Sequence, residues 1–277
     1  MTIAYFNGKI VEMDQPVVPI DERGHQFGDG VYEVIKVYKN KPFMMKEHMD
    51  RLYKSAEAIK LTINESRQEM EELLHDLIQK SGLEDAEVYL QVTRGIAPRN
   101  HLFPTCPSSL SVIVKPPRHL PEKARTEGVK VHLTEDLRWK KCYIKSLNLL
   151  PNTLAKQEAY ENGCFEAILV RDGYITEGSS SNFFLVKNGE LVTTPLSDSI
   201  LHGITRLAVK QIAETDGIPF VEKHLTPDDL FEADEAFVTS TGVEVAPITT
   251  ADGHTIGSGQ AGPISKKLYE KFIELTK

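Results

Sequence analysis

The sequence predicts an α/β (α+β) protein made of two domains, and two observations support this prediction. Short segments rich in β-branched and aromatic residues alternate with amphipathic helical segments along the whole chain. The segment Lys115–Pro121 interrupts this pattern, because two adjacent prolines and a third nearby cannot lie inside a helix or a central strand. We therefore expect an N-terminal α/β domain at residues 1–118 and a C-terminal α/β domain at residues 119–277.

The N-terminal half is expected to begin with a β-hairpin. Ile3–Phe6 and Lys9–Val11 flank Asn7 and Gly8, a pair typical of a two-residue type I′ turn. Further strands are expected in three segments with β-forming composition: 31–38, 88–93 and 110–114. Two helices are expected where apolar residues gather on one face: 46–59 and 68–80.

The C-terminal half continues the alternation of strands and helices. The dipeptides Asp172-Gly173 and Asn188-Gly189 are turn signals, and each separates two short β-forming segments. Strands are expected in six segments: 129–133, 166–170, 174–176, 182–186, 191–193 and 235–240. Helices are expected in four segments: 148–161, 205–214, from Thr226-Pro227 onward, and from Pro263 to the C-terminus.

The composition is typical of a globular protein, with 40% hydrophobic and 26% charged residues. No apolar run is long enough to cross a bilayer, and the N-terminus lacks a signal-peptide pattern, so we expect no membrane association. Three cysteines without C-x-x-C spacing are expected of a cytoplasmic protein. The net charge of −8 argues against a nucleic-acid partner, because no basic stripe could neutralise phosphates.

Several common site signatures are absent. Gly28 and Gly30 lack the third glycine of a dinucleotide-binding loop, because position 33 is Glu33, and they precede a predicted strand instead of a helix. No G-x-x-x-x-G-K-[ST] occurs, and the serines at 179–181 do not form G-x-S-x-G. The nine histidines show no metal-ligand spacing, so we expect no metal site.

Lys145 and Glu177 form the most informative pair in the chain. Lys145 lies in Cys142–Asn148, and Glu177 begins the small-residue segment Glu177–Asn182, where we expect a loop. A lysine amine can form a Schiff base with a cofactor aldehyde, and a carboxylate beside a pyridine nitrogen favours the protonated ring. Alone, these residues would be interpreted as a solvated cation and a turn residue. Together they match the needs of pyridoxal phosphate (PLP) chemistry.

The segments around this pair resemble the fold-type IV PLP enzymes, and among these the D-amino acid aminotransferases. The similar segments lie between Arg23 and Pro247, and the most distinctive are Arg23–Gly30, Glu135–Trp139, Lys145–Leu150 and Thr176–Asn182. The resemblance implies a two-domain fold-type IV architecture with PLP at the domain interface. It also implies a homodimer.

The resemblance further implies which residues hold the cofactor. Lys145 would form the Schiff base and move the proton, Glu177 would contact the pyridine nitrogen, and Arg51 would bind the phosphate through bidentate bonds. Taken alone, Arg51 would be assigned to the solvated side of an amphipathic helix. Thr205 is expected to cap a helix whose N-terminal N–H groups bind the phosphate. The other implied cofactor-binding residues are Ser180, Leu201, Ile204, Ser240 and Thr241.

The segment Thr93–His101 distinguishes between subfamilies. By itself it would be interpreted as a surface loop with scattered cations. In D-amino acid aminotransferases an Arg-x-His pair in this loop binds the substrate α-carboxylate together with a tyrosine, and it does so in the active site of the other subunit. The resemblance therefore assigns substrate binding to Tyr32, Arg99 and His101.

These residues predict transamination between a D-amino acid, of the D-alanine or D-glutamate type, and a 2-oxo acid, 2-oxoglutarate or pyruvate. Three alternatives remain open within the same fold: a branched-chain L-aminotransferase, an aminodeoxychorismate lyase, and a PLP-binding protein without activity. The side-chain pocket of the substrate is not defined by the sequence, and Val34 and Ser181 are candidate lining residues.

Overall fold

The structure is a computed structural model that describes residues 1–277. Its chain divides into two compact units. The first unit consists of Met1–Arg118 and Ile144–Asn148, and the second of His119–Tyr143 and Leu149–Lys277. No helix combines the length and the apolar character that a bilayer crossing requires. That the two units are separate folding domains stays a prediction.

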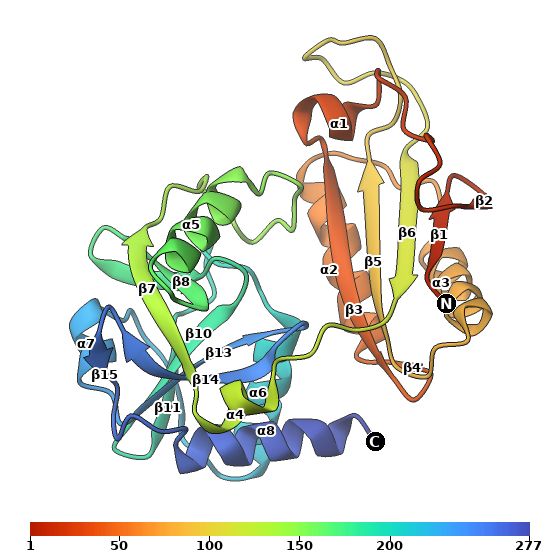
Figure 1. Cartoon of the computed structure of the whole chain (residues 1–277). Helices are drawn as coiled ribbons and strands as arrows, with labels where there is room; N and C mark the ends of the chain where they lie inside the picture. Colours follow the sequence, from red (N-terminus) through yellow and green to blue (C-terminus); the bar gives the residue numbers. More distant parts are fainter. The chain divides into compact units, whose positions relative to one another are not determined.

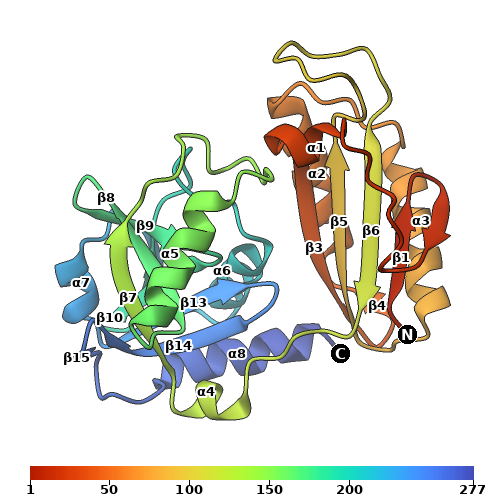
Figure 2. The ribbon, with the colours of Figure 1, turned by 45° about the horizontal axis from the view of Figure 1, so that its top comes forward.

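The first unit is built on a six-stranded antiparallel sheet with the order β2-β1-β6-β5-β3-β4 (Figure 1). Two helices cover one face of this sheet (Figure 2), and each buries apolar side chains, such as Leu52 and Leu74. The strands are β1 (Ile3–Phe6), β2 (Lys9–Val11), β3 (Gly30–Tyr38), β4 (Lys41–Pro42), β5 (Ala86–Thr93) and β6 (Ser109–Lys115). The helices are α1 (Arg23–Phe27), α2 (Met45–Ala58) and α3 (Arg67–Ser81).

The predicted hairpin is confirmed. Asn7 and Gly8 have φ angles of 43° and 91°, the left-handed conformation at both central positions that a type I′ turn requires. The short helix α1 was not predicted. Its N-cap is Glu22, whose carboxylate accepts a hydrogen bond from the His25 N–H, and its C-cap is Gly28, with a φ of 66°. Its five residues are too few to show helical periodicity in the sequence.

The second unit is built on a mixed nine-stranded sheet with the order β12-β11-β10-β13-β14-β7-β8-β9, and β15 pairs with β14. Its strands are β7 (Val129–Glu135), β8 (Glu166–Arg171), β9 (Tyr174–Gly178), β10 (Asn182–Lys187), β11 (Glu190–Thr193), β12 (Phe220–Glu222), β13 (Glu235–Ser240), β14 (Glu244–Ala251) and β15 (His254–Thr255). Its helices are α4 (Glu122–Thr126), α5 (Leu150–Glu161), α6 (Ile204–Thr215), α7 (Pro227–Phe231) and α8 (Pro263–Leu275).

The core of the second unit gathers buried side chains from both ends of the sheet, including Val131, Ile168 and Phe183. Helix α5 packs on β7 and β8, whereas α6 and α8 pack on β13 and β14 and on each other. The predicted cap at Thr226 is confirmed, since its side chain and that of Asp229 form a reciprocal capping box. Strand β14 was not predicted, because Pro247 interrupts its β-forming composition.

The segment Ile144–Asn148 differs from the predicted domain division, which assigned it to the C-terminal domain. It lies beside β3 in the first unit. The Tyr32 N–H donates to the Lys145 carbonyl at 3.0 Å, and the Leu147 N–H donates to the Gly30 carbonyl at 3.0 Å. Because these backbone bonds hold 144–148 extended, α5 begins at Leu150 and not at residue 148 as predicted.

A buried ion cluster joins β3 to α2. Both oxygens of Glu33 are bound by Arg51, through Nε at 2.7 Å and NH2 at 2.8 Å, and His48 Nδ1 lies 2.7 Å from Oε2. The side chains of Glu33 and His48 are almost fully buried. Burial alone would raise the pKa of Glu33, but Arg51 and His48 outweigh it and hold that pKa well below its usual range.

Replacing Glu33 by Gln should lower the free energy of unfolding at pH 7 by about 3–5 kcal/mol, because it leaves a nearly buried Arg51 without its carboxylate. Wild-type stability should also fall as the pH drops below 4.5, the ordinary pKa of the carboxyl group, because a lowered folded-state pKa stabilises the fold only above that value. The variant should lack the part of this loss that Glu33 contributes, whereas other carboxylates with lowered pKa values, such as Asp136, still contribute theirs. Urea unfolding at several pH values measures both effects.

The matched control is Glu57→Gln, which changes an exposed carboxylate on α2, the helix that carries Arg51, and should cost less than about 0.5 kcal/mol. Equal stability of Glu33→Gln and the wild type would contradict the stabilising role of the cluster.

Candidate active site

Lys145 is positioned by the first unit. Its backbone N–H donates to Ser55 Oγ on α2 at 3.1 Å, and its carbonyl accepts from Tyr32 on β3. Its Nζ lies 4.2 Å from the centroid of the Tyr32 ring. No hydrogen bond or ion pair engages this amine in the chain. The structure therefore brings Lys145 and Tyr32 together, and it leaves the amine available for covalent chemistry.

Arg51 lies one helical turn before Ser55, so α2 contacts the lysine segment and carries Arg51 in the same part of the unit. The guanidinium is fixed by its two bonds to Glu33. The sequence did not indicate that Glu33 binds Arg51, because the two residues lie 18 positions apart, one in a strand and the other in a helix. Phosphate binding by Arg51 stays a prediction.

Glu177 is positioned by the second unit, and the structure corrects the predicted loop, because Glu177 lies in strand β9. Its Oε1 accepts from Arg138 at 2.5 Å and from the Leu201 N–H at 3.0 Å, and its Oε2 accepts from Asn182 at 2.9 Å. Burial raises the pKa of Glu177 to about 7, and Arg138 and the other donors oppose this rise. Because every partner donates, these hydrogen bonds stabilise the carboxylate form and limit the rise that burial causes.

Arg138 is a functional candidate that sequence reasoning missed. Asp136 holds it through two bonds of 2.9 Å, and Thr176 donates to the same Asp136 at 2.8 Å. Burial would lower the pKa of Arg138, but Asp136 and Glu177 hold it above its ordinary value. The signal in the sequence was its segment, Glu135–Trp139, which resembles the D-amino acid aminotransferases but gave Arg138 no role. Arg138 thus brings a permanent positive charge to Glu177.

The start of α6 forms an anion-binding arrangement. The structure corrects the predicted cap: Gly203, not Thr205, is the N-cap, and no side chain caps the helix. A Cβ at Gly203 would lie 1.9 Å from Asn182 Oδ1, so only glycine fits there. Asn182 also donates to the Leu201 carbonyl at 2.8 Å, which connects the helix start to Glu177. The uncapped N–H groups suit a phosphate.

A buried hydroxyl adds to this donor set. Thr239 lies directly opposite Asn182 in the β10–β13 pairing, so their side chains share one face of the sheet. Thr239 Oγ1 is buried and has no hydrogen-bond partner. A buried polar atom without a partner is unfavourable, so this face is suited to a polar ligand.

Ser240 is the last residue of β13, and Thr241 follows it in the turn to β14. The Val243 N–H donates to Ser240 Oγ at 3.3 Å, and Glu244 adopts a left-handed φ of 60°. Arg125 of α4 holds this turn, donating to Glu244 Oε2 at 2.5 Å and to the Val243 carbonyl at 3.3 Å. The turn that carries two predicted cofactor-binding residues is therefore fixed from one side by a buried guanidinium.

Ser180 is oriented by a buried carboxylate. Its hydroxyl donates to Glu166 Oε2 at 2.8 Å, and Ser179 and Ser181 donate to the same carboxylate at 2.5 and 3.1 Å. Because its hydrogen is directed at Glu166, Ser180 can only accept a hydrogen bond from a ligand. Glu166 was not predicted, since nothing in the local sequence connects it to the serines.

Arg99 and His101 lie in the exposed loop between β5 and β6, and the structure brings both to one ring. The Arg99 guanidinium carbon is 4.6 Å from the centroid of Phe27, and the His101 ring is 5.6 Å away in a T-shaped contact. Tyr32, the third predicted substrate residue, contacts Lys145 and Tyr89.

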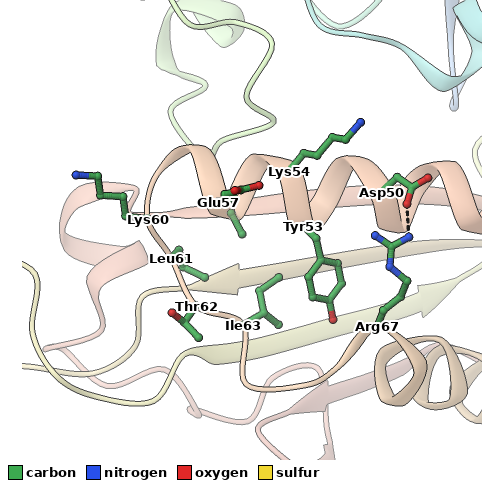
Figure 3. Close-up of a pocket in the computed structure, with 10 residues that line it drawn as sticks. Asp50, Tyr53, Lys54, Glu57, Lys60, Leu61, Thr62, Ile63 and Arg67 are labelled. Carbon is green, nitrogen blue, oxygen red and sulfur yellow. Dashed lines mark hydrogen bonds and ion pairs between the residues drawn. The ribbon is translucent and has the colours of Figure 1, made fainter.

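An open groove of about 640 Å³ lies along α2 and the segment that follows it (Figure 3). None of the predicted site residues lines it. Asp50 pairs with both Lys46 and Arg67, and the Arg67 guanidinium also lies over the Tyr53 ring. Two of its lining charges, Asp50 and Arg67, thus bind one another, and we do not assign the groove a ligand.

Comparisons with known proteins identify the family. Residues 30–251 match the sequence model described as amino-transferase class IV. The D-alanine aminotransferase of Bacillus licheniformis is 46% identical, covering 95% of this chain and 93% of that protein. The D-alanine aminotransferase of Staphylococcus epidermidis is 42% identical, covering 99% of both.

Solved structures agree on the fold. The branched-chain amino acid aminotransferase of Escherichia coli has a TM-score of 0.93 at 29% identity, covering 99% of this chain and 94% of that one. A second branched-chain amino acid aminotransferase, solved with pyridoxamine 5'-phosphate, has a TM-score of 0.92 at 29% identity with the same coverage. The predicted fold class is confirmed, and the branched-chain alternative matches as the same fold. The chain belongs to the class IV aminotransferases, which depend on PLP.

Proposed function

We propose that this chain catalyses transamination between a D-amino acid of the D-alanine or D-glutamate type and a 2-oxo acid, 2-oxoglutarate or pyruvate. The central observation is the unengaged Lys145 amine beside Tyr32. The substrate assignment is supported by identities of 42–46% to D-alanine aminotransferases, against 28–29% to the branched-chain structures named above and their relatives.

The residues present fit PLP. Lys145 supplies the amine for its aldehyde, Glu177 a carboxylate for the ring nitrogen, and Arg51 a guanidinium for the phosphate. The uncapped start of α6 and the unpartnered hydroxyl of Thr239 add donors for an anion. The remaining residues that we propose to contact the cofactor are Ser180, Leu201, Ile204, Thr205, Ser240 and Thr241. When bound, PLP supplies an electron sink for the electron pair left at the substrate Cα.

The protein residues would then have separate roles in substrate binding, proton transfer and control of the charge on the cofactor ring. Arg99 and His101, with the Tyr32 hydroxyl, bind the α-carboxylate and set which face of Cα meets Lys145. The Lys145 amine would take the Cα proton and deliver it to the cofactor carbon bonded to the substrate nitrogen, acting as base and then as acid. Glu177, whose carboxylate form Arg138 stabilises, would favour the protonated form of the ring nitrogen.

We further propose a homodimer in which the loop carrying Arg99 and His101 serves the active site of the other subunit. In support, Leu102 and Phe103 of this loop are 76% and 58% exposed, more than is usual for large apolar side chains. A cytoplasmic location is proposed as well, supported by three unpaired cysteines.

The absorbance spectrum of the purified protein tests the function and its stereochemistry. D-Alanine should bleach the yellow absorption of the lysine-bound cofactor, and L-alanine should not. Lys145→Ala should lose this absorption and at least about 10³-fold in kcat, because it lacks both the covalent anchor and the proton carrier. Lys141→Ala, an exposed lysine nearby, is the control.

Three results would redirect the proposal. Bleaching by L-alanine alone would assign the chain to the L-aminotransferases. Release of pyruvate from aminodeoxychorismate without a 2-oxo acid acceptor would indicate the lyase. Substantial turnover by Lys145→Ala would remove this lysine from the mechanism.

Replacing Arg138 by Gln should shift the pH dependence of PLP binding. Loss of the adjacent cation should raise the pKa of Glu177 above its value of about 7, by about 1 to 3 pH units. Because PLP needs the carboxylate form, its affinity should fall at pH 7 and recover toward pH 9. Titration of the apoprotein with PLP between pH 6 and 9 measures this.

The control for this variant is Arg171→Gln. Arg171 pairs with Asp136 at 3.0 Å and not with Glu177, so its loss should leave the pH profile in place. An unshifted profile for Arg138→Gln would contradict the proposed electrostatic role of Arg138.

Arg99→Ala should raise the KM for D-alanine by about 10- to 150-fold, the range expected for losing a hydrogen bond to a charged group. The dissociation constant of PLP should change little, because Arg99 contacts the substrate and not the cofactor. Steady-state kinetics with D-alanine and 2-oxoglutarate measure KM. Arg118→Ala, which removes an exposed arginine outside the loop, is the control, and an unchanged KM for Arg99→Ala would exclude Arg99 from carboxylate binding.

A further inference from the structure

Phe27, the last residue of α1, contacts both side chains of the loop that we assign to the substrate carboxylate. Arg99 lies over its ring at 4.6 Å, His101 meets the ring at 5.6 Å with an interplanar angle of 71°, and Arg23 lies over it at 4.7 Å. Phe27 is only half-buried, so its ring is not a core side chain. Polar side chains surround a ring that would otherwise be ordinary apolar surface.

The backbone of the loop is fixed from the same helix. Arg23 NH1 donates to the carbonyl of Asn100, the residue between Arg99 and His101, at 2.6 Å. Arg23 itself is 3% exposed and is held by Asp29 at 2.9 Å, and Asp29 also binds Arg94 at 2.9 Å. Helix α1 therefore holds the loop at three successive residues, twice through the Phe27 ring and once through Arg23.

The contact of Arg99 with the Phe27 ring is a cation–π contact, which uses no hydrogen-bond donor. A carboxylate binds a guanidinium bidentately through the N–H groups at its edge. Arg99 makes no hydrogen bond or ion pair within the chain, and neither does His101. Both side chains are thus restrained in direction while their polar atoms remain open to an anion.

We propose that Phe27 is the positioning residue of the carboxylate-binding pair, fixing Arg99 and His101 at one separation through its ring. The proposal rests on the proposed role of Arg99 and His101 in substrate binding. Restraining both side chains before binding reduces the conformational entropy lost when the carboxylate is bound. Losing the ring should therefore weaken substrate binding and leave the chemical step unchanged.

The test compares Phe27→Leu, which removes the ring but keeps an apolar side chain, with Phe27→Tyr, which keeps the ring. In the holoenzyme, Phe27→Leu should raise the KM for D-alanine by about 3- to 30-fold, the range of cation–π contacts from exposed to desolvated sites. Its kcat and its absorbance spectrum should stay within about twofold of the wild type. Phe27→Tyr should restore the wild-type KM.

A matched control removes an arginine–aromatic contact outside the loop. Arg67 lies over the Tyr53 ring at 5.5 Å, so Tyr53→Leu removes a contact of the same kind without touching Arg99 or His101. Its KM should stay near that of the wild type. An equal rise for Tyr53→Leu would show that loss of an aromatic ring elsewhere in the first unit has the same effect and would overturn the role of Phe27.

The double variant Phe27→Leu/Arg99→Ala distinguishes the positioning role of Phe27 from the carboxylate-binding role of Arg99, on which it depends. If Phe27 acts through Arg99, the two effects on KM should be clearly less than additive in free energy. A raised KM for Arg99→Ala with none for Phe27→Leu would overturn the positioning role alone. An unchanged KM for both would overturn the carboxylate assignment, and the positioning role with it. A loss of kcat without a change in KM for Phe27→Leu would also overturn the positioning role of Phe27.

Discussion

Two backbone hydrogen bonds between β3 and the segment Ile144–Asn148 determine where the reactive amine lies. Without them, Lys145 would be one more lysine in a connection between elements of the second unit. With them, it is the neighbour of Tyr32, and its own N–H is taken by Ser55. Backbone bonds of this kind do not depend on side-chain identity, so the placement is robust to changes in the surrounding sequence. The chemistry of the amine, by contrast, depends on the absence of any carboxylate partner.

Buried Glu–Arg pairs recur where the candidate site needs rigid geometry. Glu33 binds Arg51 between β3 and α2, Glu177 binds Arg138 beside β9, and Glu244 binds Arg125 after β13. Leaving either member of such a pair buried and alone would be costly, so each pair restrains two elements at once. The pairs have different chemical consequences. Arg51 and Glu33 fix one another, whereas Arg138 also sets the charge of a carboxylate proposed to contact the cofactor.

Features that depend on neighbouring residues could be predicted from the sequence, whereas features that depend on residues far apart in the chain could not. The turn at Asn7 and Gly8 and the cap at Thr226 are local, and both were predicted correctly. Lys145 and Glu177 were found because their flanking segments are distinctive. Arg138, Glu166 and Arg125 were missed, because their importance comes from partners that lie far away in sequence. The cap at Thr205 was placed two residues too late, because threonine is a common N-cap, whereas the close approach of Asn182 that requires Gly203 is not visible in the sequence.

The path of the chain has an evolutionary consequence. The polypeptide passes from the first unit to the second, returns for the five residues that include Lys145, and leaves again. A gene fragment ending in the proline-rich linker would encode the first sheet without the lysine that lies against it. The fragment after that linker would carry the lysine without β3. A crossover in the linker would therefore join β3 of one parent to the lysine segment of the other, and the recombinant would keep the position of the lysine only if the backbone bonds between them still form.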